Sequence, residues 1–405
     1  MRLIFLANVV SMLGSGMNAA AVVWHLLQVT HSEMSLGKLL VLQTIPALLL
    51  LPFSGVVIDR EDRRHLLLLL DFARGAVILM VAILALRGNV ELWHLYLMST
   101  LVAAGFWLFW PTISALVQEM APGSDFVAAN TLILAAVQGG WLMAGALVGF
   151  LYNQLGLGWI LIIDFATYVT SFLCYFFVRR GRTTVAVASK SAPSGAWRKF
   201  WHEMHEGIGY VKTRPHIMML GTSWALFIGA MLTQGAVTAP LSDRILHGGA
   251  VGYGWLNGGW GMGAFLSVLY SPAMIRWLKA RKTAGVSLGL LAMALVALPY
   301  SQALLIAVLL YAVMGSARGV AGTAISSEFM ELVPKHFMGR VQNTFYFAGT
   351  LLQLCLSVLV AATAHRVSLT LAFAMIALTY AVACGTAIWP GAANSEPLIA
   401  EAAAE

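Results

Sequence analysis

Long apolar runs alternate with short polar turns along almost the whole chain, and this pattern predicts membrane-spanning helices. Each run holds roughly 20 residues, the length of α-helix that crosses the hydrocarbon core of a bilayer. A helix is needed there because every backbone N–H and C=O group must be bonded within the segment. Dividing the runs at charges and turn residues gives two sets of six spans, near 3–28, 35–57, 66–86, 92–117, 129–152 and 158–178, and near 216–240, 253–275, 284–300, 303–327, 342–364 and 368–389.

One long polar stretch, residues 179–215, separates the two sets of spans and carries eight Lys and Arg residues. Because charged segments of this kind do not enter lipid, it divides the chain into two halves. We therefore expect an all-α membrane protein with twelve transmembrane helices in two six-helix pseudo-symmetric bundles. The expected parts are a first bundle at 1–178, a cytoplasmic linker at 179–215, a second bundle at 216–389 and a cytoplasmic tail at 390–405.

The composition excludes a water-soluble protein. Hydrophobic residues make up 60% of the chain, mean hydropathy is +0.82, and charged residues are 10%, against about 25% in soluble domains. The net charge of +7 falls between the spans, which favours a role in membrane topology and not in nucleic-acid binding. Cys174, Cys355 and Cys384 lie inside apolar runs without metal-like spacing, so we expect no disulfide and no metal site.

The positions of the basic residues predict the orientation, because short loops rich in Lys and Arg stay in the cytoplasm. With the N-terminus inside, most of the 24 Lys and Arg residues, Arg74 among them, fall on the cytoplasmic side. The first run is too long for the core of a signal peptide, so we expect it to remain as the first span. This predicts a multi-pass protein of a bacterial inner (plasma) membrane with both termini in the cytoplasm. The basic residues expected outside are Lys38, Arg87, Arg244 and Arg366.

The two halves share short motifs at corresponding places. The fourth span is followed by Glu-Met-Ala-Pro at 119–122 and then Asn-Thr at 130–131. The tenth is followed by Glu-Leu-Val-Pro at 331–334 and then Asn-Thr at 343–344. Two repeats joined by a linker suit alternating access, in which one half rocks against the other about a central site. The alternative is a chance similarity of short loops.

The segment Gly-Val-Val-Ile-Asp-Arg-Glu-Asp-Arg-Arg at 55–64 resembles the loop between spans two and three of the major facilitator superfamily. Further segments, at 111–130, 205–211 and 334–341, resemble the branch that contains the enterobactin exporter and the macrolide efflux proteins. The resemblance implies the major facilitator fold and an exporter. Two features depart from that branch: residues 145–150 keep only part of its antiporter motif, and span one has Ser15 and Gly16 where many relatives have an acid.

The same loop implies a cytoplasmic gate. In this fold Asp59 faces the start of span eleven, near Gly339 and Arg340, where a helix N-terminus favours an anion. Arg60 or Arg63 is expected to reach Glu119, and Arg276 or Arg281 to reach Glu331. The alternative for each basic residue is a solvated charge without a partner, because exposed ion pairs contribute little. The expected gate residues are Gly55, Asp59, Arg60, Arg63, Arg64, Glu119, Glu331 and Arg340.

Polar residues inside the spans are candidates for a substrate cavity, because polar side chains avoid lipid. Span one carries a stripe at helical spacing, Ser11, Ser15, Asn18 and His25, and span ten carries Gly315, Arg318, Gly322 and Ser326. The alternatives are interhelical hydrogen bonds for the amides and an interface position for His25. The expected cavity residues are Ser15, Asn18, His25, Gln43, Gln138, Gln234, Asn257 and Arg318.

Arg318 is the strongest of these signals, because a cation near mid-membrane requires water or a partner. Its alternative role is a structural tie to helix ends or carbonyls. Asp164 is the acid that we place well inside a span, and its expected role is structural, so the residue that carries a coupling ion stays open. We expect Gly315 and Gly322 to leave room for substrate beside Arg318.

The motifs of ATP hydrolysis, metalloproteases and serine hydrolases are missing from the sequence, so we expect no enzyme, no catalytic residues and no cofactor. The function that these observations favour is a monomeric secondary active transporter that exports an amphipathic small molecule, a siderophore or a drug, by alternating access. Its expected partners are the small-molecule substrate, membrane lipid and protons as coupling ion, without nucleic acid. The alternatives are a lipid flippase of the same fold and a non-transporting membrane scaffold or sensor.

Overall fold

The computed structural model describes the whole chain except residues 1, 61, 121–124, 179–195 and 390–405. Within the described ranges the chain consists of helices joined by short turns and forms no strand, which confirms the predicted all-α class. The elements are α1 (Arg2–Thr30), α2 (Glu33–Arg60), α3 (Arg63–Leu86), α4 (Leu92–Met120), α5 (Asp125–Phe177), α6 (Ala196–Lys212), α7 (Pro215–Thr233), α8 (Gly235–Pro240), η2 (Leu241–Ile245), α9 (Gly249–Leu278), α10 (Ala280–Ala297), η3 (Leu298–Tyr300), α11 (Leu304–Leu332), α12 (Lys335–Arg366) and α13 (Leu369–Ala387).

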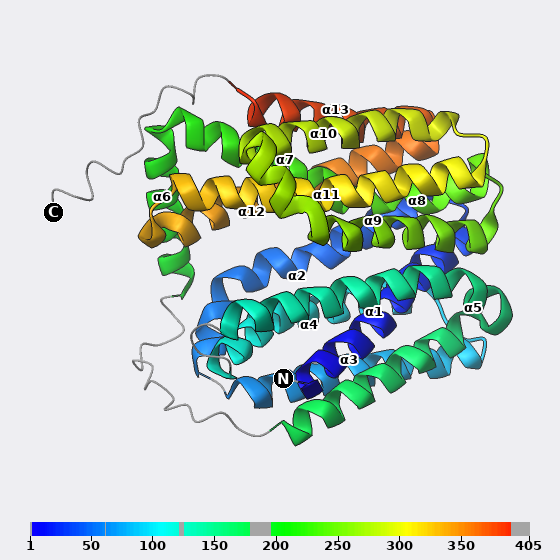
Figure 1. Ribbon diagram of the computed structural model, residues 1–405. Helices are drawn as coiled ribbons and strands as arrows, with labels where there is room; N and C mark the ends of the chain where they lie inside the picture. Colours follow the sequence, from blue (N-terminus) through cyan, green and yellow to red (C-terminus); the bar gives the residue numbers. More distant parts are fainter. Residues whose placement is uncertain (1, 61, 121–124, 179–195, 390–405) are drawn as a thin grey trace.

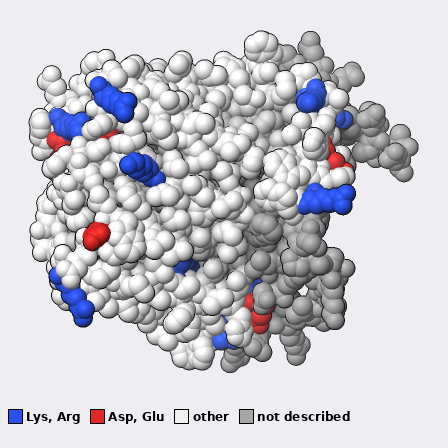
Figure 2. All heavy atoms as spheres, turned by 180° about the vertical axis from the view of Figure 1, so that it is seen from behind, with Lys and Arg blue, Asp and Glu red and all other residues white. Residues whose placement is uncertain are grey.

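The helices form two groups, which we call the N-half (α1–α5) and the C-half (α7–α13) (Figure 1). Within the described residues, 10 helical segments are long and apolar enough to cross a membrane. The remaining two expected spans correspond to the first part of α5 and to α9. On the face shown in Figure 2, charged side chains lie toward two opposite ends, and the band between them is almost free of charge. This distribution is that of a polytopic membrane protein.

Helix α5 contains the fifth and sixth predicted spans as two legs. They meet at Gly156, where φ is 72°, a backbone conformation that glycine adopts without the steric cost of a side chain. The second leg packs against α1 and α3 in the core of the N-half. The break at Gly156 therefore reverses the direction of the chain between the fifth and sixth spans.

The second part of the predicted linker forms helix α6, and residues 179–195 lie outside the described part of the chain. Charged and aromatic residues occupy different faces of α6, so that Phe200 and Trp201 pack on Phe347 of α12, with ring centroids 6.0 and 6.1 Å apart. Glu206 forms an ion pair of 2.9 Å with Arg340 of α12. The polar stretch is thus attached in part to the C-half.

Two arginines, Arg64 and Arg281, occupy equivalent places in the two halves. Arg64 is the second residue of α3 and donates through Nε to the Tyr175 carbonyl (2.9 Å) and through Nη2 to the Phe176 carbonyl. Arg281 is the second residue of α10 and donates to the carbonyls of Ala387 (2.8 Å) and Trp389 (2.7 Å). Each arginine therefore binds carbonyl groups at the C-terminal end of the last helix of its own half, which are left free when a helix ends.

The two halves meet along α2 with α12 and along α5 with α9. These crossings are close because small residues face each other: a Cβ on Gly145 would lie 2.8 Å from the backbone of Asn257, and one on Gly254 would lie 2.9 Å from Gly149. On the other crossing, the Thr44 hydroxyl donates to Gln353 Oε1 at 2.7 Å. Glycine contacts of this kind allow backbone approach between helices in lipid.

Candidate functional site

Arg318 lies near the middle of α11, roughly 20 Å along the helix from its first residue. Its Nε donates to the sulfur of Met231 on α7 at 2.8 Å. Its guanidinium carbon is 4.9 Å from the ring centroid of Trp260 on α9. The side chain is partly exposed, and no carboxylate of the described residues forms an ion pair with it. The guanidinium of Arg318 thus lies between the Trp260 ring and the Met231 thioether, and no described carboxylate neutralises its charge.

Gly315 positions Trp260 beside this arginine. A Cβ on Gly315 would lie 1.9 Å from the Trp260 carbonyl oxygen, so α11 rests directly on α9 at this point. The expectation that Gly315 leaves room for substrate is therefore wrong, because α9 backbone fills the space. A Cβ on Gly322 would meet only Phe227, at 3.9 Å, so the face of α11 one turn below Arg318 is open by comparison.

The predicted stripe on α1 forms hydrogen bonds with α5. The Ser15 hydroxyl is 2.9 Å from the Tyr168 hydroxyl, and Asn18 Nδ2 donates to Asp164 Oδ2 at 2.7 Å. His25 Nδ1 is 2.8 Å from the Tyr152 hydroxyl. These three residues therefore join helices within the N-half, and their place in a substrate cavity stays a prediction.

The other predicted polar residues lie in different parts of the two halves. Gln234 is buried beside the Tyr311 hydroxyl, and Asn257 Nδ2 donates to the carbonyl of Tyr253 on its own helix at 2.8 Å. Gln43 is half-buried on α2. The side chain of Gln138 lies outside the described part of the structure.

A buried ion pair in the N-half was missed by the sequence analysis. Asp71 and Arg74 of α3 are 1% and 2% exposed, and Arg74 Nη2 is 2.5 Å from Asp71 Oδ1. The guanidinium carbon of Arg74 is 4.8 Å from the ring centroid of Phe109 and 4.7 Å from that of Tyr168. The assignment of Arg74 to the cytoplasmic side is thus wrong. The signal was available, because the two residues are three apart, one helical turn, inside the apolar run 66–86.

The predicted cytoplasmic gate is described only in part. Gly55 and the side chains of Asp59, Arg60 and Glu119 lie outside the part of the structure whose surroundings are described. Arg63 Nη1 donates to the Ala115 carbonyl at 3.3 Å, Arg64 and Arg281 bind helix ends as described above, and Glu331 is exposed. Arg340 pairs with Glu206 of α6, a partner that sequence reasoning did not consider.

A charged contact between the halves lies at the opposite end of the molecule from α6. Glu33, at the start of α2, is fully buried. Arg244 Nη1 lies 2.6 Å from Glu33 Oε1, and His365 Nδ1 lies 3.2 Å from Glu33 Oε2. Arg244 also donates to the carbonyl of His31 at 3.3 Å. We call Glu33, Arg244 and His365 the inter-half latch, because Glu33 belongs to the N-half and the two basic residues to the C-half.

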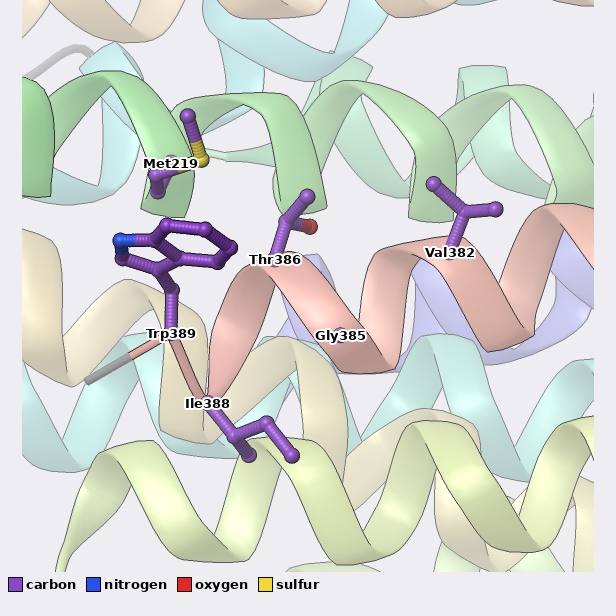
Figure 3. A pocket seen from close by; sticks show the side chains of 6 residues that line it. All are labelled: Met219, Val382, Gly385, Thr386, Ile388 and Trp389. Atoms are coloured by element: carbon purple, nitrogen blue, oxygen red, sulfur yellow. The ribbon is translucent and has the colours of Figure 1, made fainter. Parts of the chain in front are cut away.

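Figure 3 shows a groove between α7 and α13 whose lining is mostly apolar, unlike the polar sites described above. Trp389 and Ile388 at its edge are 54% and 53% exposed, and its one hydroxyl donates to the Ala383 carbonyl. The groove offers apolar contact without a charged group, as a surface facing lipid does. It is lined by Met219, Val382, Gly385, Thr386, Ile388 and Trp389.

Known sequences similar to this chain include transporters. Macrolide efflux protein A of Streptococcus pyogenes is 21% identical over 364 residues, which cover 88% of this chain and 86% of that protein. The uncharacterised MFS-type transporter YkuC of Bacillus subtilis (strain 168) is 24% identical over 249 residues. That alignment spans 59% of this chain and 55% of YkuC, so it compares only about half of the relative.

Solved structures share the fold at low identity. The nucleoside transporter NupG superimposes with a TM-score of 0.76 at 13% identity, covering 95% of this chain and 99% of that chain. A bacterial homologue of the iron transporter ferroportin in an inward-facing state gives a TM-score of 0.71 at 16% identity, covering 95% and 98%. The family model of the Major Facilitator Superfamily matches residues 4–354. The chain belongs to the Major Facilitator Superfamily.

Proposed function

We propose that this protein is a secondary active transporter that exports an amphipathic small molecule carrying an anionic or acceptor-rich group, by alternating access coupled to protons. The observation that carries the proposal is Arg318, a cation near mid-membrane without a carboxylate partner among the described residues. Siderophores and oxygen-rich drugs are the classes of molecule that fit this chemistry.

The surroundings of Arg318 support substrate binding over a structural tie. Charge inside a membrane is costly unless it meets water or an opposite charge. Trp260 and Met231 supply only a ring face and a thioether, which are weaker partners than a carboxylate. The planar guanidinium retains donors that suit carboxylate, catecholate or carbonyl oxygens of a bound molecule. An apolar body of the same molecule would lie against Trp260.

The contacts between the halves support alternating access. The latch, the pair Thr44 and Gln353, and the crossing of Gly149 with Gly254 lie in the half of the molecule farther from α6. We infer that these contacts close that end of the transporter; if the linker is cytoplasmic, this end faces outward. Polar hydrogen bonds and one ion cluster at that end can break when the halves rock.

The export direction rests on the efflux relative. Macrolide efflux protein A aligns over most of both chains, although at 21% identity it leaves the substrate open. Among substrate classes, Arg318 favours molecules with acceptor oxygens. Catecholate siderophores and macrolides both carry such oxygens on an apolar frame, so they are the two probes to compare.

Transport into everted membrane vesicles tests this function. Vesicles that contain the protein are energised with an inwardly acidic gradient and given a radiolabelled catecholate siderophore or macrolide. We expect accumulation of at least one probe that disappears when the gradient is collapsed and when Arg318 is replaced by Ala. Proton-coupled export of these classes would be contradicted if neither probe accumulated above the level in vesicles without the protein. It would also be contradicted if accumulation were the same with and without the proton gradient.

A further inference from the structure

Three ionisable side chains are buried together between α3 and the second leg of α5. Asp71, Arg74 and Asp164 are 1%, 2% and 0% exposed. Arg74 forms the ion pair with Asp71 and also acts electrostatically on Asp164. Tyr168 and Tyr175 of α5 are the other titratable groups that face this set. Helix α1 contributes uncharged groups, and α4 contributes Phe109 and Gly105.

The charges of these three side chains do not balance. One arginine faces two acids, so the group carries a net negative charge if both acids are ionised. A buried net charge is strongly unfavourable, and a single bound proton removes it. The cluster is therefore neutral only when one of its two acids is protonated.

The hydrogen-bond geometry favours Asp164 as the acid that holds that proton. Asp71 accepts from Arg74 at 2.5 Å and from the Ser171 hydroxyl at 2.6 Å, as expected of a carboxylate. Asp164 Oδ2 accepts from Asn18 Nδ2 at 2.7 Å. Its Oδ1 lies 3.3 Å from the Thr167 hydroxyl, whose one hydrogen is donated at 2.7 Å to the Asp164 carbonyl. A protonated Oδ1 can instead donate to Thr167, which satisfies both groups.

Arg74 holds the donor that an ionised Asp164 would need. Its Nη1 is buried without a hydrogen-bond partner among the described residues. When the proton leaves Asp164, this N–H group is free to bind the new carboxylate, and the cluster then carries one excess negative charge shared over two acids. The two protonation states thus favour different arrangements of the Asp164 and Arg74 side chains.

Helix α1 connects this cluster to the contact between the halves. A Cβ on Gly14 would lie 2.0 Å from the Thr167 hydroxyl and 2.5 Å from Asp164 Oδ1, so α1 rests directly on the acid. Further along α1, Trp24 stacks on Tyr253 of the C-half with ring centroids 5.8 Å apart. A change in the hydrogen bond between Asn18 and Asp164 can therefore move a helix that touches the opposite half.

We propose that Asp164 is the proton-binding residue of this transporter, with Arg74 and Asp71 as the fixed charges that set its occupancy and α1 as the helix that responds. The proposal rests on the proposed proton-coupled function and names the site of coupling. The step is a simple transfer: the Asp164 carboxyl releases its proton to water on one side and takes one from water on the other, while no other bond changes.

Infrared spectroscopy on the purified full-length protein tests the proposal without any substrate. Spectra are recorded between about pH 6 and about pH 10, where exposed carboxyls stay ionised. We expect a carboxylic-acid C=O band that is present at the lower pH, is lost as the pH rises, and is absent from Asp164→Asn. The same change at an exposed position of η2, Asp243→Asn, should leave the band intact.

A second variant tests the charge count. In Asp71→Asn the cluster keeps one arginine and one acid, so Asp164 should stay ionised and the band should vanish although Asp164 is present. A band that persists in Asp164→Asn, that is missing from the wild type, or that does not respond to pH would overturn the proposal. Transport assays are separate: loss of substrate binding through Arg318 with an intact infrared titration would reject the substrate proposal alone.

Discussion

Arg74 and Arg318 both lie near the middle of a membrane-spanning helix, but only Arg74 forms an ion pair with a carboxylate among the described residues. Arg74 is 2% exposed and packs between two aromatic rings in the N-half. Arg318 is partly exposed and rests on Trp260 in the C-half. Because unpaired charge is costly in lipid, this difference supports the two separate proposals above, a substrate-binding role for Arg318 and a charge-setting role for Arg74.

The latch should hold one end of the transporter closed. Replacing Glu33 by Gln removes the charge that Arg244 and His365 share, although the partly exposed Arg244 limits the effect. We expect the population open at this end to rise roughly fivefold, equivalent to about 1 kcal/mol. Electron spin resonance between labels at positions 28 and 367 measures the distance between the halves there.

The control for this experiment is Lys38→Gln, which removes an exposed charge on α2 near the latch. It should leave the distance distribution unchanged. An unchanged distribution in Glu33→Gln as well would mean that the latch does not stabilise the closed end.

The close crossing of α5 and α9 provides a prediction with a control on the same helix. A Cβ at Gly145 would meet the α9 backbone at 2.8 Å, whereas one at Gly139 has nothing within 4 Å. Gly145→Ala should therefore force the halves apart and increase the open population in the same spin-label measurement. Gly139→Ala should have no such effect, and equal effects of both changes would rule out contact as the cause.

Arg64 and Arg281 should contribute to stability in the same way, because each binds two carbonyls at a helix end. Replacing either by Met is expected to cost about 1–2 kcal/mol and to lower the melting temperature by a few degrees. Lys should restore only part of the loss, since a point charge cannot bind two carbonyls as a fork does. Arg276→Met, at an exposed position on α9, is the control.

Retention of monodisperse protein after heating in detergent measures these melting temperatures. A loss in Arg64→Met without one in Arg281→Met would contradict the equivalence of the two halves. That result would leave the sequence motifs at 119–122 and 331–334 as the remaining support for an internal repeat.

The helices could be predicted from the sequence because lipid imposes one rule on every span: a continuous apolar run closed by its own backbone hydrogen bonds. Helix α6 was not predicted by this rule, because its charged residues are typical of a polar linker. The helical spacing of Trp197, Phe200 and Trp201, which places them on one side, was the signal that could have shown it. The buried pair of Asp71 and Arg74 was also missed. Assigning each basic residue to one side of the membrane does not consider that an acid one helical turn away can neutralise it inside the span.

The latch could not be predicted from one sequence, because Glu33 lies 332 residues from His365 along the chain. Neither residue has a local pattern that marks a partner, and the contact exists only because two helices of different halves end at the same place. Arg318 is the opposite case. Its position within an apolar run was sufficient to single it out, but its neighbours Met231 and Trp260 come from other helices and required the structure.

Substrate binding to purified Arg318 variants tests the central claim most directly. The wild-type protein, Arg318→Lys and Arg318→Ala are compared by calorimetry with whichever of the two probes the wild type transports, each normalised to folded protein. We expect Ala to weaken binding by about 2 kcal/mol, roughly thirtyfold, and Lys to weaken it less, with melting temperatures close to that of the wild type. Wild-type affinity in a stable Arg318→Ala protein would contradict the assignment of Arg318 to the substrate site.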